Sequence, residues 1–180
     1  MRKMILPLVA AAAVCAGAPA QAQVKIDMTK VTCGEYLAMD PDASRDFSTW
    51  LSGWFSQKAN EKSVDIEGLR KNIANVQKWC SSDPKESVFA GLQRAVAKAK
   101  QGTPGAVDID ATLFTCKQFV DADPDTKMLL HAWFGGFYSA KKNLTTIDMR
   151  YVNRNAKVVQ GYCEKNKRQK LMTAIEKKAK

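Results

Sequence analysis

The feature that most constrains this chain is an internal duplication. Sliding the sequence by 83 positions superposes residues 24–97 on 107–180 without a gap, and 19 of the 74 aligned pairs are identical. The cysteines fall in register, at positions 33 and 80 in one copy and 116 and 163 in the other. Similarity at a fixed offset indicates one structural unit present twice. We therefore predict a first unit at residues 24–101, a linker at 102–106 and a second unit at 107–180.

Residues 1–22 have the build of a secretory signal peptide. Arg2 and Lys3 precede an apolar run of about a dozen residues, and Ala20-Gln21-Ala22 supplies the small residues of a cleavage site. The run is shorter than the roughly 20 residues that span a bilayer. We expect the chain to be exported and released by cleavage of this segment, with retention as an anchor the minor alternative.

Four cysteines remain in the mature chain, and they allow three pairings. The duplication selects Cys33–Cys80 and Cys116–Cys163, because each unit then keeps its own bridge. An oxidising compartment favours disulfides in an exported chain. The sequence contains no Cys-x-x-Cys pair, so neither a zinc site nor a redox catalyst is expected.

Local signals predict helices at the same places in both units. Residues 32–35 (TCGE) and 115–118 (TCKQ) have the pattern of capping boxes, so a short first helix begins at each first cysteine. An Asp-Pro pair at 40–41 and again at 123–124 suits the start of a second helix, with Asp as the cap and Pro in the first turn.

A third helix is expected to open at Asp65 and Asp148 and to bury the second cysteine of each unit, and a fourth is expected to open within residues 83–86 and 166–169. No alternating segment of strand length competes with these helices. The predicted fold is therefore all-α, with two tandem four-helix units that are each stapled by one disulfide.

The second helix of each unit carries large apolar residues at positions i, i+3, i+4, i+7 and i+8. We call these sets the aromatic stripes: Phe47, Trp50, Leu51, Trp54 and Phe55 in the first unit, and Leu130, Trp133, Phe134, Phe137 and Tyr138 in the second. A stripe of this kind is most often core. Because the apolar area is large for so small a unit, we predict that part of it lies between the units or binds other proteins.

Nothing in the sequence indicates an enzyme, a cofactor or a metal site. His131 is the only histidine, and the first unit has Ser48 in its place. We expect it to be an ordinary exposed or hydrogen-bonded side chain, with a role as pH sensor the alternative. No serine lies in a Gly-x-Ser-x-Gly turn, and carboxylates such as Asp40 and Asp65 are expected to cap helices.

Positive charge is concentrated in the second unit. Residues 24–106 carry 12 basic and 10 acidic groups, whereas residues 107–180 carry 14 and 8. The basic residues gather toward the C-terminus, at Lys165, Lys167, Arg168, Lys170, Lys177, Lys178 and Lys180. Such a cluster suits an anionic envelope surface or is simply a solvated helix end. Nucleic acid is not an expected partner of an exported chain.

Residues 32–41 (TCGEYLAMDP) and, more loosely, 115–124 (TCKQFVDADP) resemble the HdeA/HdeB family of bacterial periplasmic acid-stress chaperones. In that family one disulfide-stapled helical unit is the whole protein, whereas here the unit occurs twice. The resemblance implies a folded, inactive state at neutral pH, often a dimer. It further implies that acid loosens this state and exposes apolar surface that keeps unfolding periplasmic proteins soluble.

Charge arithmetic is compatible with such a switch. The mature chain has a net charge of about +8, and protonation of its 18 carboxylates raises this to about +26, so self-repulsion opposes compact states. We predict an acid-activated holdase that forms an intrachain pseudo-dimer or a homodimer. Passive acid denaturation is one alternative. A non-catalytic envelope adaptor with a basic C-terminal face is another.

Overall fold

The computed structural model describes residues 25–98 and 109–178, so the predicted signal peptide (1–22) and linker (102–106) lie outside the described residues. The elements of the first unit are β1 (Lys25–Asp27), α1 (Cys33–Leu37), α2 (Pro41–Lys58), β2 (Ser63–Val64), α3 (Ile66–Cys80) and α4 (Val88–Lys98). Those of the second are β3 (Ile109–Asp110), α5 (Cys116–Asp121), α6 (Pro124–Lys141), β4 (Thr146–Asp148), α7 (Met149–Lys165) and α8 (Leu171–Lys178). None of these helices is long and apolar enough to cross a membrane.

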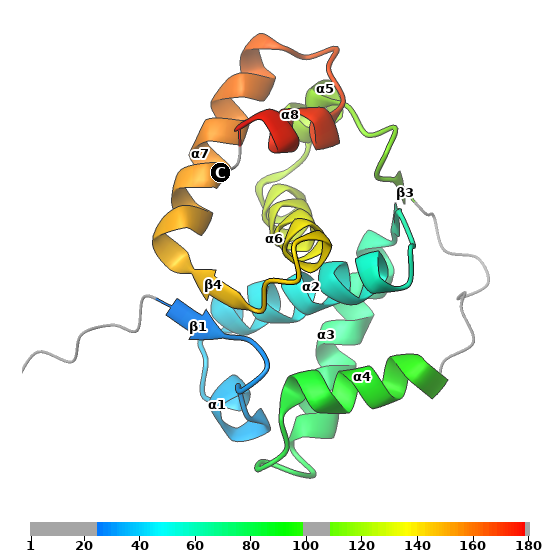
Figure 1. Cartoon of the computed structure of the whole chain (residues 1–180), viewed down its shortest axis with the longest axis vertical. Coiled ribbons are helices and arrows are strands. Elements are labelled where there is room, and N and C mark those ends of the chain that lie inside the picture. Colours follow the sequence, from blue (N-terminus) through cyan, green and yellow to red (C-terminus); the bar gives the residue numbers. More distant parts are fainter. Residues whose placement is uncertain (1–24, 99–108, 179–180) are drawn as a thin grey trace, which may run out of the picture.

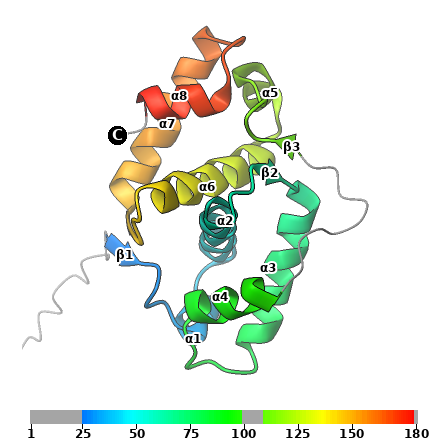
Figure 2. The same ribbon diagram turned by 45° about the vertical axis from the view of Figure 1, so that its right-hand side comes forward.

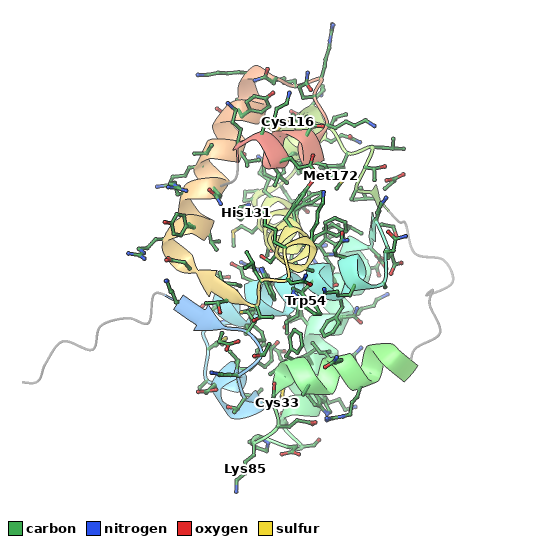
Figure 3. All side chains as sticks on the ribbon, in the orientation of Figure 1. Cys33, Trp54, Lys85, Cys116, His131 and Met172 are labelled. Carbon is green, nitrogen blue, oxygen red and sulfur yellow. A yellow bond between two sulfur atoms is a disulfide. The ribbon has the colours of Figure 1, made fainter. Side chains whose placement is uncertain are left out.

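The predicted all-α class and both disulfides are confirmed. Cys33–Cys80 joins α1 to the end of α3, and Cys116–Cys163 joins α5 to α7. Figure 1 shows α2 and α6 crossing at the centre, with α1, α3 and α4 on one side and α5, α7 and α8 on the other. Figure 2 shows the same crossing with α2 seen nearly end-on. Cys33 and Cys116 lie toward opposite ends of the molecule (Figure 3).

The predicted caps of the first three helices are present. Thr32 and Glu35 form one capping box, and Thr115 and Gln118 form the other. Asp residues cap the second and third helices of each unit by accepting a hydrogen bond from a backbone N–H of the first turn; these are Asp40, Asp123, Asp65 and Asp148. Asn60 and Asn143 follow α2 and α6 with positive φ angles of 57° and 54°, a conformation that Asn tolerates well.

The predicted start of the fourth helix is wrong by several residues. α4 begins at Val88 and α8 at Leu171, whereas residues 83–86 and 167–169 form turns. The reason is tertiary: carbonyl oxygens of this segment accept hydrogen bonds from the first N–H groups of the first helix. Cys33 N donates to Glu86 O at 2.8 Å, and Cys116 N donates to Gln169 O at 2.8 Å. These bonds hold the segment against the first helix as a turn, and the fourth helix begins only after it.

Two short antiparallel ribbons, absent from the prediction, link the units. β1 pairs with β4, and β2 pairs with β3, so each ribbon takes one strand from each unit. Figure 1 shows them on opposite sides of the α2–α6 crossing. Strands of two or three residues are too short to give a periodic sequence signal, because alternation needs several residues to be recognised.

Candidate functional site: the interface between the units

The centre of the interface is a close approach of α2 to α6 at two glycines. A Cβ atom on Gly53 would lie 1.9 Å from the Trp133 carbonyl oxygen, and one on Gly136 would lie 1.8 Å from the Trp50 carbonyl oxygen. These contacts mirror each other, because Gly53 and Gly136 occupy the same position in the two units. Only a residue without a Cβ allows the two backbones to come so near.

The aromatic stripes lie on either side of this crossing and are buried, except that Trp54 and Tyr138 are partly exposed. The first stripe belongs to the core of the first unit, where Trp54, Phe55 and Phe89 pack ring against ring. The second belongs to the core of the second unit, where Trp133 stacks on Phe137 with centroids 5.0 Å apart. Trp50 also faces the other unit, since its ring lies 3.4 Å from where a Cβ on Gly135 would be. Each stripe thus serves mainly its own core.

Neither core is made by one unit alone. Val64 and Leu69, from β2 and α3 of the first unit, are buried in the core of the second. Ile147 of β4 packs in return against the core of the first. Val64 and Ile147 occupy the same position in the two units. Separation of the units would therefore uncover these side chains together with the cores that receive them.

A charged cluster closes one edge of the interface. The Arg45 guanidinium lies 2.9 Å from a carboxylate oxygen of Asp42 and 3.0 Å from one of Asp46, and 3.5 Å from Asp125 in the other unit. Arg70 of α3 also reaches Asp125, at 2.6 Å. The Arg45 side chain is only 18% exposed, so these carboxylates compensate a charge that is largely removed from water.

This charged cluster was not predicted from the sequence. The duplicate of Arg45 is Met128, whose sulfur lies 3.9 Å from the Arg45 guanidinium, and the duplicate of Asp46 is Leu129, which is fully buried. The cluster therefore exists at one edge of the interface and has no mirror image. The signal that could have revealed it is in the alignment of the two units, where charged Arg45 and Asp46 stand opposite apolar Met128 and Leu129.

His131 lies at the same interface, partly buried on α6 (Figure 3). Its Nε2 atom is 3.3 Å from the Val152 carbonyl oxygen, and Asp46 of the other unit is close enough to interact with its charge. Burial lowers the pKa of His131, although the Val152 carbonyl and Asp46 oppose the effect. His131 is thus hydrogen-bonded, as expected, but it lies where protonation would place a positive charge between the units.

The inter-unit ribbons end in aspartates with lowered pKa values. The side chain and the backbone N–H of Thr29 donate hydrogen bonds that lower the pKa of Asp27 in β1, and Thr112 does the same for Asp110 in β3. Arg150 lowers the pKa of Asp148 in β4, chiefly by a side-chain hydrogen bond. These carboxylates stabilise the strand ends only while they are charged.

Two buried polar atoms near the stripes have no hydrogen-bond partner among the described residues: Thr49 Oγ1 and Trp54 Nε1. An unpaired buried donor costs about 1–3 kcal/mol. In the second unit Ala132 and Phe137 occupy these positions and have no such group. Within the described part of the chain, no three His, Cys, Asp or Glu side chains are grouped as metal ligands would be.

Taken together, the fold defines a tandem pair of small disulfide-stapled helical units that share an apolar interface edged by titratable groups. The family model described as the HdeA/HdeB family matches this chain twice, over residues 3–90 and 88–173. The chain therefore belongs to the HdeA/HdeB family, with two copies of the family unit. The family is periplasmic and is associated with acid-stress chaperones, and the two disulfides fit an oxidising compartment. No curated protein and no solved structure matches the chain.

Proposed function

We propose that this protein is an acid-activated holdase of the periplasm, which separates its two units at low pH and binds unfolding proteins with the apolar surface that the interface covers at neutral pH. It acts stoichiometrically and catalyses no reaction. The observation that carries this proposal is the exchange of Val64, Leu69 and Ile147 between the cores. Because of it, opening the interface exposes apolar surface on both units while the disulfides keep each unit together.

The signs of the pKa shifts support opening in acid. Asp27, Asp110 and Asp148 have lowered pKa values, so the stability they contribute is present above their unfolded-state pKa and is lost as pH falls through the folded-state value. The pKa of His131 is lowered by burial, so the fold favours its neutral form, and acid begins to destabilise the fold below a pH of about 6.5.

Asp46 acts in the opposite direction. Burial raises its pKa above the ordinary value even though Arg45 lowers it, so the folded chain favours the neutral carboxyl group. Protonation of Asp46 therefore removes a cost from the folded state. The same protonation deprives the largely buried Arg45 guanidinium of one of its ion-pair partners at the edge of the interface.

Aggregation of a denaturing client protein, followed by light scattering at about pH 3 and about pH 7, tests the activity. We expect suppression in acid and little at neutrality. A chain that expands in acid without suppressing scattering would be passively denatured, and the proposal would be wrong.

A covalent lock tests whether the units must separate. Ile26 and Ile147 face each other in the β1–β4 ribbon. Cα atoms of opposite residues in antiparallel strands are about 4.5–5.5 Å apart, which is within the range of a disulfide. We expect I26C/I147C in its oxidised form to lose most of the acid activity, and the control I26A/I147A, which weakens the same ribbon, to become active at higher pH. Full activity of the locked form would show that separation is not required.

A further inference from the structure

The exposed side of α7 and the turn that follows it form a strongly basic surface. Residues 149–178 contain nine basic residues and two acidic ones, whereas the equivalent residues 66–95 of the first unit contain five and three. All nine basic side chains are exposed: Arg150, Arg154, Lys157, Lys165, Lys167, Arg168, Lys170, Lys177 and Lys178. Figure 1 shows α7 along one outer side of the molecule, with α8 beside it.

On α7 itself the basic residues share a face with two exposed apolar side chains. At 3.6 residues per turn, Arg150, Arg154, Lys157, Lys165, Tyr151 and Val158 fall within an arc of about 120°, and we call this set the basic face. Tyr151 is 49% exposed and Val158 is 41% exposed. The Arg154 guanidinium lies over the Tyr151 ring, 4.7 Å from its centroid.

The fold does not require this composition. The first unit builds the same helix with Glu67, Gly68 and Ala74 where the second has Arg150, Tyr151 and Lys157. Arg150 is explained by its ion pair with Asp148, the N-cap of α7, at 2.7 Å, and Arg154 stands where the first unit already has Lys71. Tyr151 and Lys157 are exposed and replace Gly68 and Ala74, so the stability of α7 does not explain these two residues of the basic face.

We propose that the basic face of α7 binds the surface of an anionic lipid bilayer. The guanidinium and ammonium groups of the basic face pair with headgroup phosphates. Tyr151 and Val158, on the same face, enter the boundary between headgroups and acyl chains. These two apolar side chains favour a bilayer over a nucleic acid, whose phosphate backbone offers them no apolar layer. The opposite side of α7 holds Val159 and Cys163 in the core of the second unit, so binding does not require the units to open.

Co-sedimentation of the mature chain with vesicles at neutral pH tests this inference. The vesicles are phosphatidylcholine alone, or phosphatidylcholine with about one third phosphatidylglycerol, each at low and high salt. We expect binding to the anionic vesicles only, with weakening by salt. Reversal of two charges on the basic face in K157E/K165E should reduce partitioning by at least about tenfold.

The matched control is K78E/K85E, which makes the same change in net charge on exposed lysines of the first unit. Figure 3 shows Lys85 at the end of the molecule away from Cys116 and α8. This variant should bind the anionic vesicles nearly as well as the unchanged chain. Equal losses in the two double variants would mean that net charge alone drives binding, and the assignment to α7 would be overturned.

A third variant separates a bilayer from a soluble polyanion. Replacement of the apolar pair in Y151S/V158S should weaken vesicle binding several-fold and leave binding to inorganic polyphosphate unchanged. Unaltered vesicle binding by this variant, with full competition by polyphosphate, would make the basic face a general polyanion site. Absence of binding to anionic vesicles by the unchanged chain would refute the proposal directly.

Discussion

In the first unit the Trp79 ring of α3 lies against Gly91 of α4, so closely that a Cβ on Gly91 would be 1.9 Å from the ring. The equivalent pair in the second unit is Tyr162 of α7 and Ala174 of α8, a smaller ring with a larger partner. Core volume is thus redistributed between two positions while the helix arrangement is kept. The duplicated fold therefore tolerates such compensating substitutions inside the core when the total volume is preserved.

The edges and surfaces of the two units have diverged further than their cores. The first unit supplies Arg45 and Arg70 to the charged cluster, whereas the second supplies Asp125 and His131 to the same edge. The second unit alone carries the basic face. A duplicated chain can specialise each copy in this way, because the two copies need not be identical as the subunits of a homodimer must be.

The largest expected effect is the loss of a disulfide. Each bridge closes a loop with a sequence separation of 47 residues, so we expect C33A/C80A and C116A/C163A each to lower the free energy of unfolding by about 4 kcal/mol on the loop-entropy model. Urea unfolding followed by circular dichroism measures the change. Equal losses are expected despite the different cores. A loss below about 1 kcal/mol in either variant would contradict the staple role of that bridge.

The next largest loss of stability is expected from substitution of the two glycines at the α2–α6 crossing. G53A and G136A should each cost about 2–3 kcal/mol, because the added Cβ meets backbone atoms of the other helix. The control is G161A on α7, where a Cβ would meet nothing within 4 Å and should stabilise the helix by about 0.5–1 kcal/mol. Thermal unfolding of the three variants compares them. A neutral G136A would mean that α2 and α6 do not approach so closely.

The difference between the Trp79–Gly91 pair and the Tyr162–Ala174 pair can be tested by giving one unit the residues of the other. G91A should cost about 1–2 kcal/mol because the Trp79 ring must move, and W79Y/G91A should recover part of this loss by copying the pair of the second unit. A174G should cost about 1 kcal/mol through lost helix propensity and packing. A double variant less stable than G91A would show that the two cores are not interchangeable at this position.

The smallest expected effect concerns the capping boxes. Hydrogen bonds from the backbone N–H and hydroxyl of Thr32 lower the pKa of Glu35, so the stability from this cap is lost as pH falls through its folded-state pKa. The second unit has neutral Gln118 there. We expect E35Q to move the acid midpoint of the first unit to lower pH and Q118E to move that of the second to higher pH.

Both shifts should be smaller than about half a pH unit, because a cap is only one of several acid-sensitive groups. Hydrogen exchange followed by mass spectrometry across a pH series reports on each unit separately. Shifts in the opposite directions would contradict the sign of the Glu35 effect. G161A, which changes no titratable group, is a suitable control.

Much of the fold followed from the sequence, because its signals are local or are repeated. The duplication paired the cysteines, and hydroxyl and carboxyl groups at the helix starts located three helices in each unit, since a cap acts within three residues of itself. The alternation of buried and exposed residues in the stripes likewise depends only on helical periodicity. The rise in net charge on acidification depends only on composition.

The features that join the units were decided by the tertiary structure. The fourth helices begin late because residues around 84–87 and 167–170 serve as partners for α1 and α5. The ribbons, the exchange of Val64 and Ile147, and the ion pairs of Arg45 with Asp125 all join residues about 45 to 120 positions apart, so no local pattern records them. They arise because two amphipathic units, covalently linked, bury their remaining apolar surface against each other, and only that packing determines which side chains meet.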